Sequence, residues 1–276
     1  MKAQEAERLA EQVRIDSSKT ALERNKMGQF ATPPTLARQI TEYMLSLRNG
    51  EPISFIDPAI GSGSFFSALM HVKNGEHIEQ ACGIEVDPQF AEVSQRLWSA
   101  FGLSVQNADF TLLKPPSAEE DRFNLVLTNP PYVRHHHLDS QNKVRLKDFG
   151  TRFLGSEMSG LAGLYCYFML LSHEWMKKDA LAVWLIPSEF MDVNYGVSVK
   201  QYLLERVELL HIHRYDPADL QFDDALVSSA IVVFRNKKPE ASHLAKFSFG
   251  GPIDQPRNEC EISISDLRSV RKWTSL

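Results

Sequence analysis

The stretch that decides the fold is ISFIDPAIGSGSFFSALMHV, residues 53–72. Its first five residues are a short apolar run of the kind that forms a buried strand, and residues 65–72 continue as a helix. Gly61 and Gly63 lie between the two and allow the backbone to turn and to approach a ligand closely. The stretch therefore predicts a strand, a glycine turn and a helix.

The alternation of strand and helix continues along the chain. We expect further strands at residues 81–85, 103–106, 123–128, 181–186, 207–213 and 227–234, and helices at 90–98 and 164–176. Another helix is expected to begin with Thr32 as its N-cap and Pro33 at its first position. Strands that alternate with helices form a parallel sheet covered on both faces. The sequence thus predicts a Rossmann-like α/β fold with a seven-stranded, mostly parallel sheet.

Composition narrows the class of protein. The 276 residues are 43% apolar and 24% charged, which is typical of a globular chain with one large domain and appendages. The apolar runs are too short to span a bilayer, and the charged N-terminus lacks an apolar signal core. The three cysteines form no Cys-x-x-Cys pair, so Cys82, Cys166 and Cys260 are interpreted as reduced thiols of a cytoplasmic protein.

We expect three parts along the chain. Residues 1–27 read as an N-terminal helical extension, and residues 28–240 as the catalytic domain. Within that domain, residues 133–160 are polar and bounded by glycine, which predicts a mobile loop. Residues 241–276 are too few for an independent core and are interpreted as the incomplete start of a linker or recognition region.

Polar side chains follow the first four predicted strands. Asp57, Glu85, Asp109 and Asn129 each lie at or just after a strand end. Because ligands of open α/β sheets bind at the carboxyl ends of the strands, these residues are expected to line one crevice. An acidic strand end repels a pyrophosphate but suits an ammonium group, and Glu85 suits two ribose hydroxyls. The ligand that fits is a nucleoside with an amino-acid arm and no phosphate, which is S-adenosylmethionine.

The stretch TNPPYVRHHH, residues 128–137, indicates a second kind of contact. Its two prolines fix the backbone and withhold their N–H groups, which leaves a carbonyl and the Asn129 amide to face a ligand. Tyr132 adds a flat aromatic surface beside them. We interpret this turn as a binding site for a small, planar, polar group.

Several motifs occur in one order and carry a resemblance to a known family. They are GQFATPP (28–34), DPAIGSGSF (57–65), GIEVDP (83–88), NADF (107–110), TNPPYV (128–133), GLYCYFMLLSHEWMK (163–177), WLIPSEF (184–190) and FDDALVSSAIVVF (222–234). Over roughly residues 25–236 the chain resembles the catalytic domain of gamma-class N6-adenine DNA methyltransferases of the TaqI type. The resemblance implies a class I S-adenosylmethionine-dependent methyltransferase fold. It also implies methyl transfer to the exocyclic amine of an adenine flipped out of double-stranded DNA, in a restriction-modification or phage-defence system.

The resemblance assigns roles to particular residues. It implies that the ribose of the cofactor is bound by Glu85 and its adenine by Asp109, Phe110 and Phe168. The residues implied for the methionine end are Phe30, Ala31, Thr32, Asp57, Ala59 and Gly61. Asn129, Pro130, Pro131 and Tyr132 form the catalytic motif, with Asn129 also beside the cofactor, and Tyr132 and Phe222 stack on the target base.

The chemistry of that motif follows from the target. The exocyclic amine of adenine is a poor nucleophile, so two fixed acceptors must hold its N–H bonds. The Asn129 side-chain oxygen and the Pro130 carbonyl are the expected pair. No metal is expected: the consecutive residues His135, His136 and His137 cannot easily converge on one ion.

Contact with DNA is expected to be limited. The segment 134–152 holds two acidic residues and five basic ones, which predicts weak contacts to the DNA backbone by Arg134, Lys143, Arg145, Lys147 and Arg152. The formal net charge of −5 argues against a large nucleic-acid surface. We therefore expect the target-recognition part to be a domain or subunit not contained in this chain, which is prokaryotic or phage-encoded.

Two alternatives stay open. Asn-Pro-Pro-Tyr also serves enzymes that methylate glutamine in proteins or guanine amines in RNA, although GQFATPP and FDDALVSSAIVVF favour DNA. The other alternative is a cofactor-binding DNA module without catalysis, against which the intact motif argues.

Overall fold

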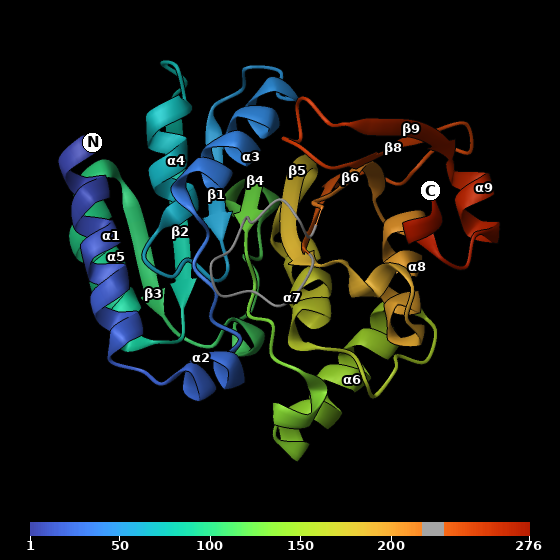
Figure 1. Ribbon diagram of the computed structural model, residues 1–276, viewed down its shortest axis with the longest axis horizontal. Helices are drawn as coiled ribbons and strands as arrows, with labels where there is room; N and C mark the ends of the chain where they lie inside the picture. The colour runs from blue at the N-terminus through green and yellow to red at the C-terminus, as the bar shows by residue number, and fades with distance from the viewer. Residues whose placement is uncertain (217–228) are drawn as a thin grey trace.

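The computed structural model describes residues 1–216 and 229–276, and these form an α/β fold around one sheet (Figure 1). In the described residues the sheet has nine strands in the order β3-β2-β1-β4-β5-β7-β6-β8-β9. The strands are β1 (Ile53–Asp57), β2 (Ile78–Glu85), β3 (Leu103–Asn107), β4 (Phe123–Thr128), β5 (Met176–Pro187), β6 (Glu208–Arg214), β7 (Ser229–Arg235), β8 (Leu244–Phe249) and β9 (Asn258–Ser263). Strands β1 to β5 are parallel, whereas β7 runs antiparallel to both β5 and β6.

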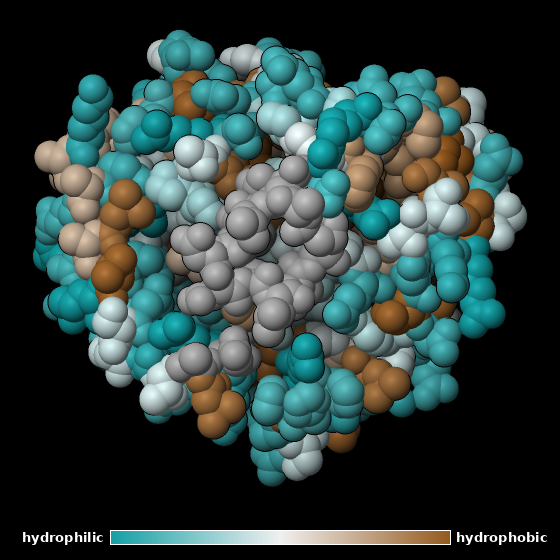
Figure 2. Space-filling view, in the orientation of Figure 1, coloured by the Kyte–Doolittle hydropathy of each residue, from teal (hydrophilic) through white to brown (hydrophobic). Residues whose placement is uncertain are grey.

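Helices cover both faces of the sheet (Figure 1). They are α1 (Lys2–Ser17), α2 (Ala21–Met27), α3 (Pro34–Ser46), α4 (Ser64–Val72), α5 (Pro88–Trp98), α6 (Ser140–Leu154), α7 (Leu164–Ser172), α8 (Val197–Glu205) and α9 (Ile264–Ser269). None of those in the described ranges is long and apolar enough to cross a membrane. The face in Figure 2 is largely hydrophilic, with apolar side chains in small groups.

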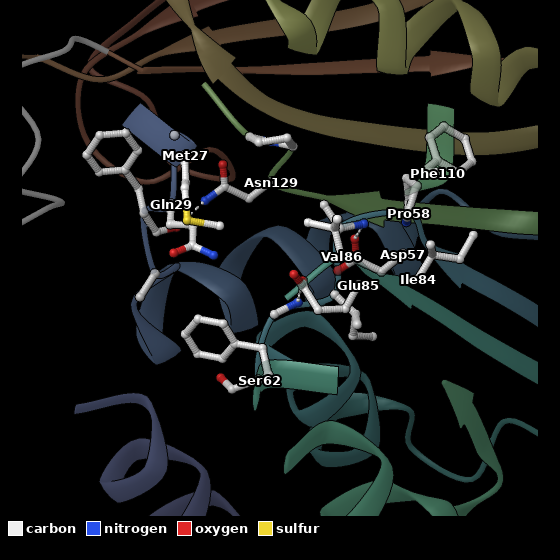
Figure 3. Close-up of a pocket in the computed structure, with 18 of the residues that line it drawn as sticks. Met27, Gln29, Asp57, Pro58, Ser62, Ile84, Glu85, Val86, Phe110 and Asn129 are labelled. Atoms are coloured by element: carbon white, nitrogen blue, oxygen red, sulfur yellow. Dashed lines mark hydrogen bonds between the residues drawn. The ribbon is translucent and has the colours of Figure 1, made fainter. Parts of the chain in front are cut away.

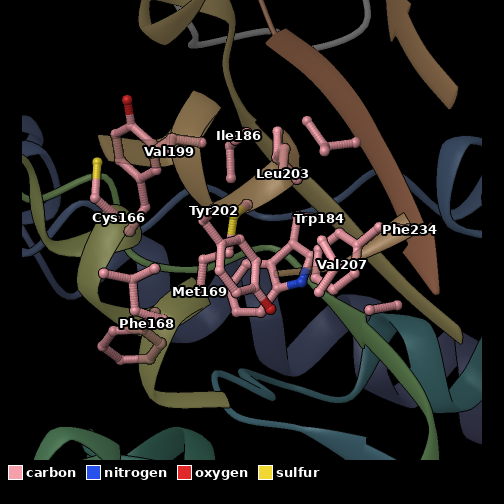
Figure 4. Close-up of a cluster of buried hydrophobic side chains, with 14 of the residues drawn as sticks. Cys166, Phe168, Met169, Trp184, Ile186, Val199, Tyr202, Leu203, Val207 and Phe234 are labelled. Carbon is pink, nitrogen blue, oxygen red and sulfur yellow. The ribbon is translucent and has the colours of Figure 1, made fainter. Parts of the chain in front are cut away.

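Alternation of side chains along the central strands produces two cores. On β5, Val183 packs with α3, α4 and α5, whereas its neighbour Trp184 packs with α7 and α8. The second core is built on large side chains, among them Trp184, Tyr202 and Phe234 (Figure 4). Because residues i and i+1 of a strand face opposite sides, one buried strand supplies both cores. This explains why the sequences of these strands are apolar throughout and do not alternate with polar residues.

The prediction of seven strands was wrong, because residues 241–276 join the same sheet. β8 pairs in parallel with β6, and β9 pairs antiparallel with β8. Ala245 and Phe247 are buried and alternate with more exposed neighbours, which is the pattern of a half-buried strand. The segment extends the catalytic sheet instead of starting a separate region.

A closed chain of hydrogen bonds fastens β8 to β6 and α3. Tyr43 Oη lies 2.8 Å from His211 Nδ1, and His211 Nε2 lies 2.6 Å from Ser248 Oγ. His213 Nδ1 contacts the same hydroxyl at 2.8 Å, and its Nε2 lies 3.0 Å from the Gly251 carbonyl oxygen. Burial lowers the pKa of His211 to about 3, so this imidazole is neutral at ordinary pH.

The segment 133–160 was expected to be a loop, but most of it folds as α6. Asp139 caps the helix by accepting from the Asn142 amide at 2.9 Å, and Gly155 ends it in a left-handed conformation. Three positions four residues apart face the core, namely Leu146, Gly150 and Leu154. A Cβ at Gly150 would lie 2.2 Å from Met158 Sδ, so this helix packs closely at that point.

Two helix boundaries also differ from the sequence prediction. α3 begins at Pro34 with Pro33 as its N-cap, because the Thr32 hydroxyl is used as an acceptor elsewhere. The helix predicted over residues 164–176 ends at Ser172, and a short 3₁₀ turn leads into β5 at Met176.

Candidate cofactor pocket and active site

A cavity of about 290 Å³ lies at the carboxyl ends of β1, β2 and β4. All eleven residues predicted to bind the cofactor line it: Phe30, Ala31, Thr32, Asp57, Ala59, Gly61, Glu85, Asp109, Phe110, Asn129 and Phe168. In Figure 3, Phe110 lies at one end of the pocket and Met27 with Asn129 at the other, with Glu85 and Asp57 between them. The pocket is therefore elongated and changes chemically along its length.

Asp57 is a buried carboxyl at the end of β1. Its Oδ1 accepts from the Thr128 hydroxyl at 2.7 Å and from the Ala59 amide at 3.0 Å. Both bonds go to one oxygen, which leaves Oδ2 for a ligand in the cavity. Burial, helped by the charge of Glu85, raises the pKa of Asp57 to about 7. A cation placed beside it would favour the ionised form, so this part of the pocket suits an ammonium group.

Glu85 ends β2 and is held by two backbone amides. Its Oε2 accepts from the Gly61 N–H and its Oε1 from the Asp87 N–H, both at 2.9 Å. Each carboxylate oxygen keeps a second lone pair, so the group can accept from two ligand hydroxyls as well. Burial raises the pKa of Glu85, although these two amides act in the opposite direction.

The glycine turn brings its backbone against Trp98. Gly63 has φ +91°, and a Cβ there would lie 2.4 Å from the Trp98 indole nitrogen. That nitrogen donates to the Ser62 carbonyl at 3.0 Å and so fixes the turn. Gly61, with φ +54°, then presents its amide to Glu85.

Asn129 carries a buried acceptor with no partner among the described residues. Its Nδ2 donates to the Phe30 carbonyl at 2.9 Å and to Thr32 Oγ1 at 3.1 Å. Because a carbonyl only accepts, the nitrogen must face Phe30, and Oδ1 faces the other way. Oδ1 is shielded from solvent and makes no hydrogen bond with the described residues. An unpaired buried acceptor costs about 1–3 kcal/mol, and a ligand donor placed beside it would remove that cost.

The rest of the Asn-Pro-Pro-Tyr turn is fixed from both sides. Tyr132 donates its amide to the Gly28 carbonyl at 3.1 Å and its hydroxyl to the Leu185 carbonyl at 3.0 Å. Burial raises the pKa of Tyr132 far above its usual value. Its ring lies 5.4 Å from that of Phe30. A Cβ at Gly28 would lie 2.4 Å from the Tyr132 nitrogen, which explains why glycine begins the GQFATPP motif.

The other end of the pocket is aromatic. The Phe110 ring lies 5.1 Å from Phe168 and 5.4 Å from Trp175, measured between centroids. Asp109 precedes it and caps a short 3₁₀ turn by accepting from the Thr111 amide at 2.9 Å and the Thr111 hydroxyl at 2.8 Å. A carboxylate next to an apolar wall suits a flat heterocycle with an amino substituent.

Of the catalytic motif, Asn129 and Pro131 line the cavity, whereas Tyr132 and the buried Pro130 do not. Phe222 lies outside the described residues. His135, His136 and His137 form a short 3₁₀ turn, and the described part of the chain holds no cluster of three metal-ligating side chains.

The basic residues near the turn differ from one another. Arg134 and Arg152 are exposed, and Lys143 is half-buried. Lys147 pairs with Glu157 at 2.8 Å, and Arg145 donates to Thr111. The last two therefore have partners within the protein.

Sequence reasoning missed the contribution of α1 to the pocket. Gln12 and Asp16 line the cavity, and the buried Arg8 donates to Ser62 Oγ at 3.0 Å and Ser64 Oγ at 2.9 Å. α1 is a mostly polar helix with no motif, and only its contacts reveal this role. The signal for Arg8 would have been a charged residue three positions after Glu5, to which it is bonded on both carboxylate oxygens.

The fold is that of the class I S-adenosylmethionine-dependent methyltransferases. A putative class I S-adenosylmethionine-dependent methyltransferase from Listeria monocytogenes has the same fold, with a TM-score of 0.69 at 14% identity over 90% of this chain and 72% of that one. The type IIG restriction endonuclease BpuSI gives a TM-score of 0.67 at 18% identity over 87% of this chain and 31% of that one.

More specifically, the chain belongs to the Eco57I restriction-modification methylase family, whose model matches residues 64–220, more than half of the sequence. It is 29% identical to the type II methyltransferase M.AccI of Acinetobacter calcoaceticus over 91% of this chain and 46% of that protein. It is 30% identical to M.XamI of Xanthomonas campestris pv. amaranthicola over 76% of this chain and 39% of that protein. The chain spans less than half the length of these relatives.

The residues of the pocket fit S-adenosylmethionine, the cofactor of this class. Asp57 would offer an oxygen to the ammonium of the methionine arm, and Glu85 would offer two lone pairs to the ribose. Asp109 and Phe110 suit the adenine. When bound, this cofactor supplies an electrophilic methyl group on a sulfonium that leaves readily.

Proposed function

We propose that this chain carries the catalytic part of a DNA methyltransferase, which transfers a methyl group from S-adenosylmethionine to the exocyclic amine of an adenine in double-stranded DNA. Family membership supports a role in restriction-modification. The observation that carries the proposal is the buried, unpaired Oδ1 of Asn129 beside the cofactor pocket. An exocyclic amino group is a donor that suits this acceptor.

Asn129 performs the central step by holding the target nitrogen. Its Oδ1 and the Pro130 carbonyl accept the two N–H bonds of the amine and direct the nitrogen lone pair toward the methyl group. Positive charge develops on the nitrogen during transfer, so fixed acceptors stabilise the transition state more than the bound substrate. The bonds from Asn129 to Phe30 and Thr32 fix the acceptor beforehand, which lowers the cost of orientation.

The adenine must leave the duplex to reach this pocket. We assign Tyr132 and Phe222 to the stacking of the extruded base, each worth about 1–3 kcal/mol. The hydrogen bond from Tyr132 to Leu185 holds the ring in position. Arg134, Lys143 and Arg152 remain candidates for contact with the DNA backbone, whereas the internal partners of Arg145 and Lys147 speak against them in that role. Sequence reading by a separate recognition domain or subunit is part of the proposal.

The test is transfer of label from methyl-labelled S-adenosylmethionine to duplex DNA, to RNA and to a protein extract, each offered separately. The expected result is label in DNA alone, at low salt and high protein concentration. The Asn129→Ala variant is the control and should transfer none. Label in RNA or protein with DNA unlabelled would contradict the proposal.

A further inference from the structure

Arg145 on α6 is bonded to the turn that follows Asp109. Its Nη1 donates to the Thr111 carbonyl at 2.7 Å, and its Nη2 donates to Thr111 Oγ1 at 2.9 Å. The same Nη2 donates to Asn142 Oδ1 at 3.0 Å, one turn earlier on α6. Thirty-four residues of sequence separate Arg145 from Thr111, so this contact is a tertiary one.

The direction of the next hydrogen bond is determined by chemistry. A guanidinium only donates, so the Thr111 hydroxyl must accept from Arg145. The single proton of that hydroxyl is then available for Asp109 Oδ1, 2.8 Å away. The Thr111 amide donates to the same oxygen at 2.9 Å. The result is a relay from Arg145 through Thr111 to one oxygen of Asp109.

This relay determines which way the Asp109 carboxylate points. Both internal bonds go to Oδ1, and Asp109 lines the cavity beside Phe110. Oδ2 is the oxygen left for a ligand at the aromatic end of the pocket. A carboxylate held at one oxygen by two donors cannot rotate without breaking both bonds. Its second oxygen therefore recognises a donor at a fixed place, which for adenine is its exocyclic amino group.

We propose that Arg145 is a positioning residue for the cofactor site: through Thr111 it orients Asp109 and so gives the pocket its preference for a base with an exocyclic amino group. The inference rests on the proposed cofactor site. It replaces the expectation that Arg145 contacts DNA, because its guanidinium is engaged by Thr111 and Asn142. It also links α6, which begins shortly after the Asn-Pro-Pro-Tyr turn, to the far end of the pocket.

The test compares two ligands by calorimetry: S-adenosylhomocysteine and its inosine counterpart, in which an oxo group replaces the amino group. The parent should bind the adenine ligand at least tenfold more tightly, since the oxo group cannot donate to Asp109. Arg145→Met should reduce this preference about tenfold, mainly by lowering the affinity for the adenine ligand. Thr111→Val should act in the same way, whereas Thr111→Ser keeps the hydroxyl and should retain the preference.

Arg152→Met is the matched control, because Arg152 is an exposed arginine on the same helix. It should leave the ratio of the two affinities unchanged. Melting temperatures identify any variant that does not fold. The comparison of Thr111→Ser with Thr111→Val involves the smallest change in packing.

Two results would overturn the inference. One is that Arg145→Met lowers the affinity for both ligands equally, as expected of a merely structural role. The other is an unchanged ratio together with weaker DNA binding and a smaller salt dependence, which is the mark of a phosphate contact. If the parent bound neither ligand, the proposed cofactor site itself would be wrong, and the inference with it.

Discussion

Two buried polar networks lie in this sheet, and they differ in whether they are closed. Around Asn129 and Asp57, each side chain bonds to the protein through one atom and leaves an oxygen facing the cavity. In the chain from Tyr43 to Gly251, every ring nitrogen and the Ser248 hydroxyl has a partner within the protein. The first network keeps a position for a ligand, whereas the second fastens a strand.

The donor and the acceptor of each hydrogen bond in the closed network can be assigned. Because the Gly251 carbonyl only accepts, His213 Nε2 must donate to it, and His213 Nδ1 then accepts from Ser248. Ser248 in turn accepts from His211 Nε2, and His211 Nδ1 accepts from Tyr43. Every group is satisfied in this arrangement, so it contributes to stability and offers nothing to a substrate.

The largest effect is expected at the open acceptor. Asn129→Ala removes an oxygen needed mainly in the transition state, so turnover should fall by a factor of about 10² to 10³ or more. Affinity for S-adenosylmethionine should change little. Single-turnover rates and calorimetry measure the two quantities. Thr32→Val removes one bond to Nδ2 and leaves Oδ1 in place, so it should lower turnover by a much smaller factor. A normal rate for Asn129→Ala would remove Asn129 from the mechanism.

Glu85→Gln should weaken S-adenosylmethionine binding almost as much as Glu85→Ala. The amide nitrogen of glutamine cannot accept, so one backbone N–H, of Gly61 or Asp87, loses its acceptor and one ribose hydroxyl loses its partner. The cost should be about 1.5–3 kcal/mol, measured as a change in Kd. An affinity equal to that of the parent would show that the ribose is bound elsewhere.

Asp57→Asn should separate stability from binding. The pKa of Asp57 is about 7 in the folded protein and 3.8 is its ordinary value, so between these the folded state holds a proton that the unfolded state has lost. Stability therefore falls as pH rises from about 4 to 7, and the ionised carboxyl is a cost above that range. The variant keeps the acceptor for Thr128 and Ala59, so without cofactor it should be more stable at pH 8, by about 1–3 kcal/mol.

The same variant should bind S-adenosylmethionine about tenfold more weakly, because the ammonium loses its counter-charge. In the parent, affinity should decline as pH falls below about 7, and in Asp57→Asn this decline should be absent. Denaturant unfolding and calorimetry at pH 6 and 8 provide the data. A variant less stable than the parent at pH 8 would contradict the cost assigned to this carboxyl.

The smallest effect on activity is expected in the closed network. Ser248→Ala removes the hydroxyl shared by His211 and His213 and leaves one acceptor and one donor unpaired. Unfolding free energy should fall by about 1–3 kcal/mol, with single-turnover rates unchanged. Chemical denaturation gives the first quantity. A Ser248→Ala protein with parent stability and reduced turnover would reverse the contrast between the two networks.

The sequence predicted the pocket well because its signals are local. Asp57, Glu85, Asp109 and Asn129 follow strand ends directly, and parallel strands bring their carboxyl ends to one edge. The family resemblance placed the remaining pocket residues by motif. The motif predicts an acceptor at Asn129, whereas the direction in which its oxygen points depends on Phe30 and Thr32, which lie about a hundred residues earlier.

What escaped prediction depends on contacts distant in sequence. β8 is half-buried only because β6 is beside it, and Ala245 and Phe247 alone are too short a pattern to indicate a strand. α6 was taken for a loop because its core-facing positions are diluted by polar residues. The relay from Arg145 to Thr111 joins two ordinary surface residue types, and no spacing in the sequence marks it.

If the open acceptor of Asn129 receives an N–H of an exocyclic amine, the methyl group must arrive on that nitrogen. The methylated atom can be identified with S-adenosylmethionine that carries a deuterated methyl group, duplex DNA and mass spectrometry of the digested nucleosides. The expected result is the deuterated methyl on the exocyclic nitrogen of adenine in the parent reaction and none with Asn129→Ala. Deuterated methyl on a ring carbon, or equal labelling by Asn129→Ala, would contradict it.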